Sequence, residues 1–171
     1  MRERVRWRDW PREASLTPTS RGRRDDEVEG LVHTFVCPAC HAILKDESWF
    51  VDEALYERLD GQPGVRPTLC PGCLRVVRGT YEGEVVLCSP LLSVTKPAAL
   101  QLIGKEEARA HRINPMSRVT ALEDHGDEIT VLTTTPMLAE RIGRTFRRVY
   151  DGKLEIERPP AARLYHVRWQ R

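Results

Sequence analysis

The sequence predicts an α+β protein in which a zinc-ribbon or treble-clef-like four-cysteine domain is joined by a helix to a small β-β-α-β-β domain. Three observations predict this class: two Cys-x-x-Cys pairs, a helical stretch with clear start and stop signals, and short alternating stretches around it. With 171 residues, 40% of them hydrophobic and 6% aromatic, one large core is not expected. Small domains bury proportionally less surface and often need a disulfide or a bound metal for stability.

The chain divides by composition and pattern into four segments. The N-terminal segment is rich in arginine and has no steady apolar period, so we expect a mobile basic arm in which Trp7 and Trp10 lie among arginines. The expected divisions are a basic flexible arm at 1–30, a zinc-ribbon domain at 31–92, a linker helix at 93–116 and a ββαββ domain at 117–171.

In the cysteine region, the apolar pattern predicts short strands and one inserted helix. An alternating stretch leads into Cys37, and residues 41–51 supply a partner strand. Leu55 and Leu59 stand at helical spacing, which predicts a short helix over 52–60 between the two cysteine pairs.

Two further elements precede the C-terminal part. Residues 83–92 read as a strand that still belongs to the cysteine region, with Cys88 as a small buried apolar residue. Residues 97–112 read as a helix closed by Pro115, which bridges the two parts of the chain.

The C-terminal segment has the clearest pattern. Alternating residues over 117–135 predict a hairpin that turns at His125-Gly126. A helix over 136–150 follows, capped by Thr135 and ended by Gly152. Its apolar stripe comprises Leu138, Ile142, Phe146 and Val149. The last two expected strands cover 153–158 and 163–171.

The cysteines are the strongest chemical signal. Cys37, Cys40, Cys70 and Cys73 form two Cys-Pro-x-Cys turns, and a tight turn of this kind presents two sulfurs on one side. Two such turns complete a tetrahedral four-thiolate set, so we predict one structural zinc ion. The gap of 29 residues between the pairs exceeds the usual 15–20, and the inserted helix accounts for the excess.

Other uses of the same cysteines carry less support. Cys37-Pro-Ala-Cys40-His41 matches the motif for attaching a c-type haem, but that leaves the second pair unexplained. A thioredoxin-like redox pair needs one Cys-x-x-Cys on a βαβ frame, which the pattern does not provide. The N-terminus lacks an apolar signal region and the chain has no long apolar run, so we expect a cytoplasmic protein with reduced thiols and no membrane span.

Charge is distributed unevenly. Residues 1–24 carry eight Lys/Arg and three Asp/Glu, residues 25–135 carry ten and eighteen, and residues 136–171 carry nine and four. Basic ends around an acidic middle favour contact with a polyanion, although arginines that merely keep the protein soluble give the same totals. The candidate nucleic-acid-binding residues are Arg141, Arg144, Arg147 and Arg148 on the expected helix and Arg168 on the last strand.

The motifs resemble a family of small uncharacterised bacterial zinc-ribbon proteins. The resemblance covers most of the chain and rests on "VCPACHAIL", "LCPGCLRVVRGTYEGEVVL", "HRINPMSRVTALE", "ITVLTTTPMLAERIG" and "YDGKLEIE…HVRW". That family is distantly related to the N-terminal zinc region of the ribosomal large-subunit export adaptor named for nonsense-mediated decay, which has more cysteine pairs and binds the ribosome. The resemblance implies metal ligands at Cys37, Cys40, Cys70 and Cys73 and no catalytic residue; His41 stands where such ribbons usually have glycine.

The sequence thus favours a non-catalytic, zinc-stabilised protein that associates with RNA or the ribosome through its basic arm and arginine-rich helix. A zinc-stabilised protein-interaction adaptor is the alternative, in which the acidic region meets a basic partner. An enzyme with a redox or metal-water centre is the least supported class, because four protein ligands leave the metal no open position. Neither favoured class requires a small-molecule substrate.

Overall fold

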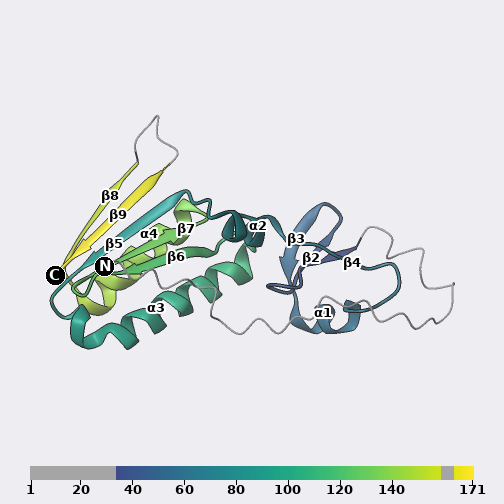
Figure 1. Ribbon diagram of the computed structural model, residues 1–171, viewed down its shortest axis with the longest axis horizontal. Helices are drawn as coiled ribbons and strands as arrows, with labels where there is room; N and C mark the ends of the chain where they lie inside the picture. The colour runs from purple at the N-terminus through teal and green to yellow at the C-terminus, as the bar shows by residue number, and fades with distance from the viewer. Residues whose placement is uncertain (1–33, 159–163) are drawn as a thin grey trace.

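The computed structural model describes residues 34–158 and 164–171 and is a mixed α+β structure with four helices and two mixed sheets in that part of the chain. Figure 1 shows a smaller sheet carrying the early part of the chain and a larger sheet carrying the rest, with helix α2 (Pro71–Arg78) between them. We call residues 34–82 the cysteine unit, and residues 83–158 with 164–171 the sheet unit.

The cysteine unit contains a four-stranded sheet in the order β3-β2-β1-β4. Its strands are antiparallel except for β4, which runs parallel to β1. Helix α1 (Glu53–Leu59) follows β3, and the Asp52 side chain caps it by accepting a hydrogen bond from the Leu55 N–H at 2.9 Å. The inserted helix expected at 52–60 is therefore confirmed. The strands are β1 (Phe35–Val36), β2 (Ala42–Lys45), β3 (Ser48–Val51) and β4 (Arg66–Pro67).

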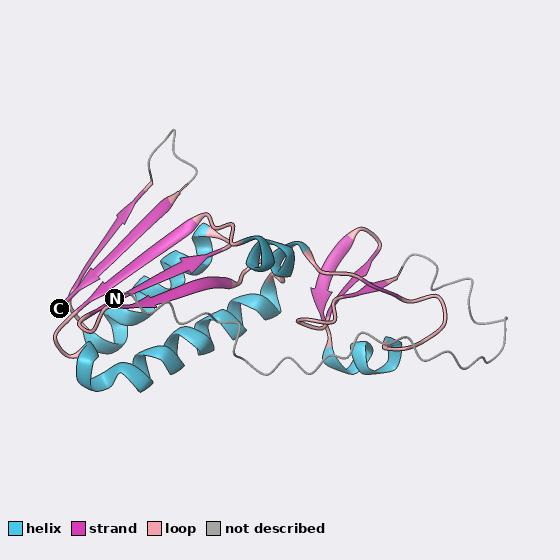
Figure 2. Cartoon of the chain, viewed as in Figure 1, coloured by secondary structure: helices cyan, strands magenta, loops and turns pink. Residues whose placement is uncertain are grey.

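The sheet unit contains a five-stranded sheet in the order β6-β7-β5-β9-β8 (Figure 2). The hairpin turning at His125-Gly126 is confirmed as β6 and β7, with Gly126 at φ +84°. The last two strands form the expected second antiparallel pair. The strands are β5 (Gly83–Cys88), β6 (Val119–Asp124), β7 (Glu128–Thr133), β8 (Lys153–Glu157) and β9 (Tyr165–Gln170).

The position of β5 differs from the expectation that residues 83–92 belong to the cysteine region. Val85 pairs antiparallel with Val131 of β7 and parallel with Val167 of β9, which makes β5 the central strand of the second sheet. The expected ββαββ arrangement is therefore incomplete, because it lacks the strand that joins its two hairpins. We expected this strand in the cysteine region because it follows Cys73 closely in the sequence. Its buried residues Val85 and Leu87 instead pack in the core of the sheet unit.

Helix α3 (Leu92–Ile113) is longer than the expected helix over 97–112 and is more than a linker. It begins five residues earlier, with Pro97 inside it, and it packs beside helix α4 (Pro136–Tyr150) (Figure 1). Ala99, Ile103 and Ala110 of α3 lie in the same core as the strands of the sheet. The helix thus forms part of the sheet unit.

Helix α4 packs against the sheet through the predicted stripe, except at its last member. Leu138, Ile142 and Phe146 are fully buried, and the Phe146 ring meets the edge of the Trp169 ring at 5.5 Å between centroids. Val149 is 53% exposed, so its assignment to the stripe was wrong, and Tyr150 packs against the core instead. Both α3 and α4 lie on one face of the sheet, and no helix of the described residues lies on the other face (Figure 1).

Candidate metal centre

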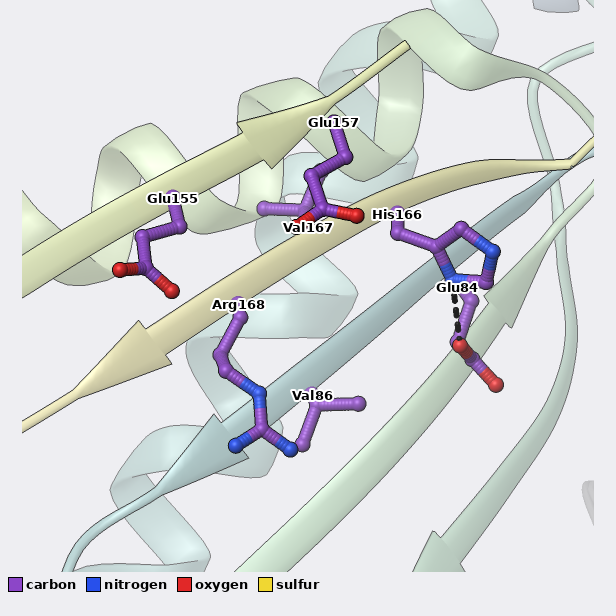
Figure 3. Close-up of a pocket in the computed structure, with 7 residues that line it drawn as sticks. All are labelled: Glu84, Val86, Glu155, Glu157, His166, Val167 and Arg168. Atoms are coloured by element: carbon purple, nitrogen blue, oxygen red, sulfur yellow. Dashed lines mark hydrogen bonds and ion pairs between the residues drawn. The ribbon is translucent and has the colours of Figure 1, made fainter. Parts of the chain in front are cut away.

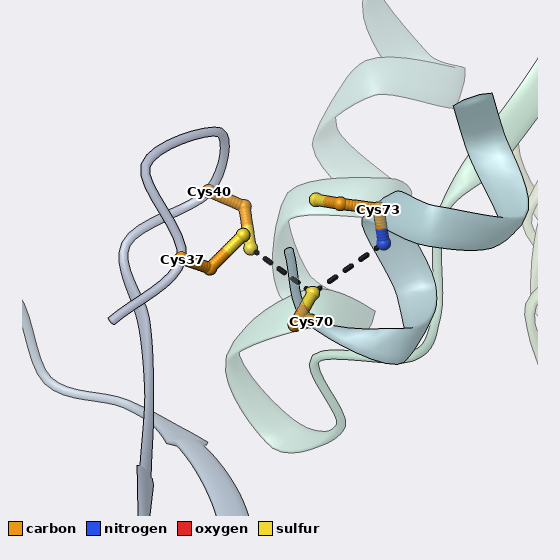
Figure 4. Close-up of side chains that lie close together, drawn as sticks. All are labelled: Cys37, Cys40, Cys70 and Cys73. Atoms are coloured by element: carbon orange, nitrogen blue, oxygen red, sulfur yellow. Dashed lines mark hydrogen bonds between the residues drawn. The ribbon is translucent and has the colours of Figure 1, made fainter. Parts of the chain in front are cut away.

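The four predicted cysteines converge at the point where the cysteine unit meets helix α2. Cys37 and Cys40 belong to the turn between β1 and β2, Cys70 is the N-cap of α2, and Cys73 lies in its first turn. Figure 4 shows the two pairs facing each other from these separate elements. The tetra-cysteine cluster is thus built from segments 30 residues apart in sequence, as the two Cys-Pro-x-Cys turns predict.

The spacing of the sulfurs fits one metal ion. All four Sγ atoms lie within 4.8 Å of one another, and Cys40 Sγ is 3.5 Å from Cys70 Sγ. A tetrahedral ion with metal–sulfur bonds of about 2.3 Å places its ligand sulfurs about 3.8 Å apart. The donor set and its compactness therefore fit a single four-coordinate ion, and four thiolates are a set typical of structural zinc.

Backbone hydrogen bonds shape both turns. The Cys37 N–H donates to the Ala42 carbonyl at 2.7 Å, and the His41 N–H donates to the Cys37 carbonyl at 2.8 Å, which closes the first turn. In the second turn, the Cys73 N–H donates to Cys70 Sγ at 3.4 Å. Gly72 has no room for a side chain, since an added Cβ would lie 2.4 Å from the Pro115 carbonyl oxygen.

The four thiols change one another's pKa values. Hydrogen bonds with Cys40, Cys70 and Cys73 hold the pKa of Cys37 far below its usual value, whereas the bonds with Cys37 and Cys70 raise the pKa of Cys40. Cys37 raises the pKa of Cys70, but Cys40 and Cys73 outweigh it and leave that pKa at about 7. Hydrogen bonds with all three partners raise the pKa of Cys73. A divalent cation binds cysteines as thiolates, so metal binding should release the protons of those thiols that are still protonated.

His41 is not part of the cluster, and its half-exposed side chain contacts helix α1. Its ring stacks on the Tyr56 ring at 4.1 Å between centroids, and its Nδ1 pairs with a Glu53 carboxylate oxygen. The residue has φ +62°, a left-handed conformation that glycine adopts more readily than a residue with a Cβ. The histidine of the apparent haem motif therefore packs against helix α1.

Arg118 and His111 lie near the cysteines and were missed by sequence reasoning. The Arg118 guanidinium donates to Cys73 Sγ at 3.4 Å, although the two residues are 45 positions apart. His111 Nε2 is buried without a hydrogen-bond partner; burial, and then the charge of Arg118, lower the pKa of His111 to about 4, so its imidazole is neutral near pH 7. No local motif marks either residue, because His111 reaches the site from α3 and Arg118 reaches it from the loop that precedes β6.

Cys88 does not join the metal cluster, and it is less buried than expected. It ends β5, is half-buried and lies on the face of the sheet away from the helices, as does Val86. The predicted role as a small core residue was therefore wrong.

The predicted nucleic-acid-binding arginines do not share one environment. Arg141 donates to Glu106 at 2.6 Å, and Glu106 is only 2% exposed, so Arg141 neutralises a buried carboxylate of α3. Arg144 donates twice to Glu140, at 2.9 and 2.7 Å. The sequence identified Glu140 as the nearby acid and missed Glu106, which comes from another helix.

The other three arginines lie on different surfaces. Arg147 and Arg148 are exposed on α4, and Arg148 also donates to Thr145 Oγ1 at 3.3 Å. Arg168 lies on the opposite face of the sheet from α4, because its neighbours Val167 and Trp169 point to the helices. Residues 1–33 and 159–163, and with them the basic arm and its two tryptophans, lie outside the described residues.

A hollow occurs on the helix-free face of the sheet, which we call the open sheet face (Figure 3). It brings together three carboxylates, an imidazole and a guanidinium from adjacent strands, and His166 Nδ1 lies 2.8 Å from a Glu84 carboxylate oxygen. The side chains that chiefly line it are Glu84, Val86, Glu155, Glu157, His166 and Arg168. This surface carries more acidic than basic groups.

Among the described residues, no helix is long and apolar enough to cross a membrane. Comparison of the chain with protein-family models, curated proteins and solved structures finds no match. The resemblance to bacterial zinc-ribbon proteins therefore depends on the motifs alone and stays a prediction. What the structure does establish is a compact four-cysteine site for one metal ion in a mixed α+β chain.

Proposed function

We propose that this chain is a non-catalytic, zinc-stabilised protein that binds the phosphate backbone of RNA, free or in the ribosome. The observation that carries the proposal is the exposed arginine edge of α4, formed by Arg144, Arg147 and Arg148. We call these three residues the α4 arginine edge. The metal's part is to fold the cysteine unit, and the arginine edge supplies the contact surface.

Zinc is the ion that best suits the cluster. Thiolate is a soft ligand, and a closed set of four thiolates around a tetrahedral ion is the usual composition of a structural zinc site. Such a set leaves no position for water or substrate, so the ion contributes folding free energy rather than Lewis-acid catalysis.

The α4 arginine edge suits phosphate because two of its members have no acidic partner. In the described ranges, no ion pair involves Arg147 or Arg148, and both side chains are exposed. A guanidinium presents planar N–H donors that match phosphate oxygens. Arg141 is excluded from the edge because it is committed to buried Glu106, and Arg168 is excluded because it lies on the open sheet face.

The test is RNA binding by the full-length, zinc-loaded protein, measured by fluorescence anisotropy with labelled single-stranded RNA over a series of salt concentrations. Arg147→Gln and Arg148→Gln should each weaken binding and reduce the slope of log K against log salt by about 0.7 per lost phosphate contact. Arg168→Gln is the matched control, since it removes the same charge from the opposite face of the sheet.

Equal effects of all three substitutions would contradict a localised edge and indicate a general charge effect. Binding that survives both α4 substitutions would assign RNA contact to the arm at 1–30. Absence of salt-dependent binding to RNA would overturn the proposal.

A protein-interaction adaptor is the second candidate, and the open sheet face is the observation that favours it. Within residues 34–158 and 164–171 no helix covers this face, and its hollow carries Glu84, Glu155 and Glu157, so it would suit a basic protein segment. A partner that co-purifies after nuclease treatment, and is lost on Glu155→Gln with Glu157→Gln, would favour this function over RNA binding.

A further inference from the structure

A four-thiolate metal centre carries a net negative charge, and here that charge is buried. Four thiolates and one divalent ion leave a net charge of −2, while Cys37 and Cys70 are fully buried and Cys73 is almost so. Burying charge costs free energy unless an opposite charge or hydrogen-bond donors accompany it. The Cys73 N–H supplies one donor, to Cys70 Sγ. The remaining excess charge calls for a cation.

Arg118 is that cation. Within the described residues, it is the one positively charged side chain with a hydrogen bond to a cysteine sulfur, at 3.4 Å from Cys73 Sγ. Its Nε donates to a Glu107 carboxylate oxygen at 2.9 Å, and the same oxygen accepts the Val119 N–H at 3.1 Å. The guanidinium is therefore held by two different nitrogens, with Nε on Glu107 and Nη1 on Cys73 Sγ.

Neighbouring groups cannot take over this role. Arg75 is close in sequence to Cys73, but it pairs with Glu82 at 2.8 Å and donates to the Thr134 carbonyl at 2.8 Å. His111 lies nearby but is neutral. A guanidinium does not lose its proton in proteins, so Arg118 carries its positive charge beside Cys73 Sγ.

We propose that Arg118 is a positioning residue of the metal centre: it balances charge on the Cys73 thiolate and thereby couples metal binding to the sheet unit. The inference rests on the proposed metal at the four cysteines and adds a residue that belongs to the other unit. A charge-assisted hydrogen bond of this kind both stabilises the thiolate and fixes the side of the site from which it is held.

The backbone around Arg118 gives the coupling a structural route. The Arg118 N–H donates to Thr134 Oγ1 at 2.7 Å, and the Thr134 N–H donates to the Arg118 carbonyl at 2.8 Å. Thr134 also accepts from Arg75 of α2 and lies just before the N-terminus of α4. Helix α2, which carries Cys73, is thus hydrogen-bonded to the segment that leads into the α4 arginine edge. Metal loading would fix α2 against this segment of the sheet unit as the cysteine unit folds.

The first measurement is the zinc affinity of the full-length protein, by competition with a chelator of known affinity. Arg118→Gln should weaken zinc binding about 10–100-fold, the usual effect of removing a partner of a metal ligand. Arg118→Lys should restore part of the affinity, because it keeps the charge. Arg109→Gln is the control. Arg109 lies on α3 and pairs with buried Glu106 at 2.8 Å, and among the described residues it makes no hydrogen bond to a cysteine sulfur.

The second measurement separates a charge effect on one sulfur from general loosening. Zinc-loaded protein is treated with iodoacetamide, and the rate of alkylation at each cysteine is determined by mass spectrometry. Arg118→Gln should accelerate alkylation of Cys73 relative to Cys37, Cys40 and Cys70, because Cys73 alone loses its guanidinium donor.

The outcomes distinguish this inference from the proposed function. Wild-type protein that binds no zinc overturns the metal assignment itself. If wild type binds zinc, two results overturn the role of Arg118 and leave the metal assignment standing. One is an equal loss of zinc affinity in Arg118→Gln and Arg109→Gln, and the other is an equal rise in the alkylation rate of all four cysteines in Arg118→Gln. An affinity of Arg118→Gln within threefold of wild type does the same.

Discussion

The cysteine unit and the sheet unit differ in what fills their interiors. The sheet unit buries a contiguous core of 17 residues that includes Phe146 and Trp169. The cysteine unit has a cluster of four buried residues, Val36, Ile43, Tyr56 and Leu59, beside a second cluster made mainly of the cysteines themselves. The sheet unit therefore has an ordinary hydrophobic core. The cysteine unit has a small hydrophobic cluster beside the metal site.

This difference indicates that the cysteine unit is the one that depends on the metal. Small units bury too little apolar surface to offset the conformational entropy lost on folding, and they depend on disulfides or metals. Four buried side chains and strands of two to four residues place the cysteine unit in that class. The sheet unit, with a five-stranded sheet covered by two helices, should fold without help from the ion.

Removal of the metal should produce the largest effect and should affect the two units unequally. Binding of structural zinc contributes about 10–16 kcal/mol in zinc-finger peptides, far more than four buried side chains can replace. We expect Cys37→Ser with Cys70→Ser, or chelation, to unfold the cysteine unit. Hydrogen exchange should then show loss of protection at β2 and β3 and retained protection at β5 and β9.

Cys88→Ser is the control for that experiment, since Cys88 is a free thiol outside the metal cluster. It should leave both metal content and hydrogen exchange as in the wild-type protein. Loss of protection throughout β5 and β9 on chelation would show that the ion stabilises the entire chain, and the contrast between the units would fail.

A matched pair of core truncations should give the next largest effect. Ile43 and Ile103 are both fully buried, one in each unit. Ile103→Ala should lower the free energy of unfolding of the sheet unit by about 2–5 kcal/mol, because the surrounding core is extensive and relaxes little. Ile43→Ala should instead weaken zinc affinity, because folding of the cysteine unit is coupled to metal binding.

Thermal unfolding and zinc competition on the same two variants make the comparison. A loss of zinc affinity in Ile103→Ala as large as that in Ile43→Ala would show that both isoleucines support one cooperative core. The expected result is a crossed pattern, in which each substitution changes mainly one of the two measurements.

The sequence was most informative where the signals are local. The two Cys-Pro-x-Cys turns predicted the metal ligands, and the start of α4 at Pro136 and the turn at Gly126 marked the C-terminal elements correctly. Each of these features depends on residues a few positions apart. Even so, Thr135 occupies the N-cap without a capping hydrogen bond; its hydroxyl lies 3.1 Å from Ser117 Oγ instead.

The remaining features depend on contacts between distant segments and could not be predicted in this way. The pairing of β5 with β9 joins residues 82 positions apart, as the Glu84–His166 contact illustrates. The pairing of Arg141 with Glu106 and of Arg118 with Cys73 likewise requires the packing of the helices on the sheet. An arginine count indicates a basic surface, but only the fold separates Arg168 from the α4 arginine edge.

The smallest expected effect concerns His41, the residue that creates the apparent haem motif. At φ +62°, a side chain with a Cβ is strained, whereas glycine adopts this conformation readily. His41 offsets the strain by stacking on Tyr56 and pairing with Glu53. His41→Ala loses these contacts and keeps the strain, so we expect it to be less stable than His41→Gly by about 1 kcal/mol.

Lys45 provides the control, because it is an exposed residue of strand β2 with an ordinary strand conformation. There the order should reverse: Lys45→Gly should be less stable than Lys45→Ala, since glycine loses more backbone freedom on folding. Zinc competition measures all four variants, because folding of the cysteine unit and metal binding are linked. If alanine is the more stable replacement at both positions, the backbone at residue 41 is not strained. The histidine would then be held there by its contacts with Tyr56 and Glu53 alone.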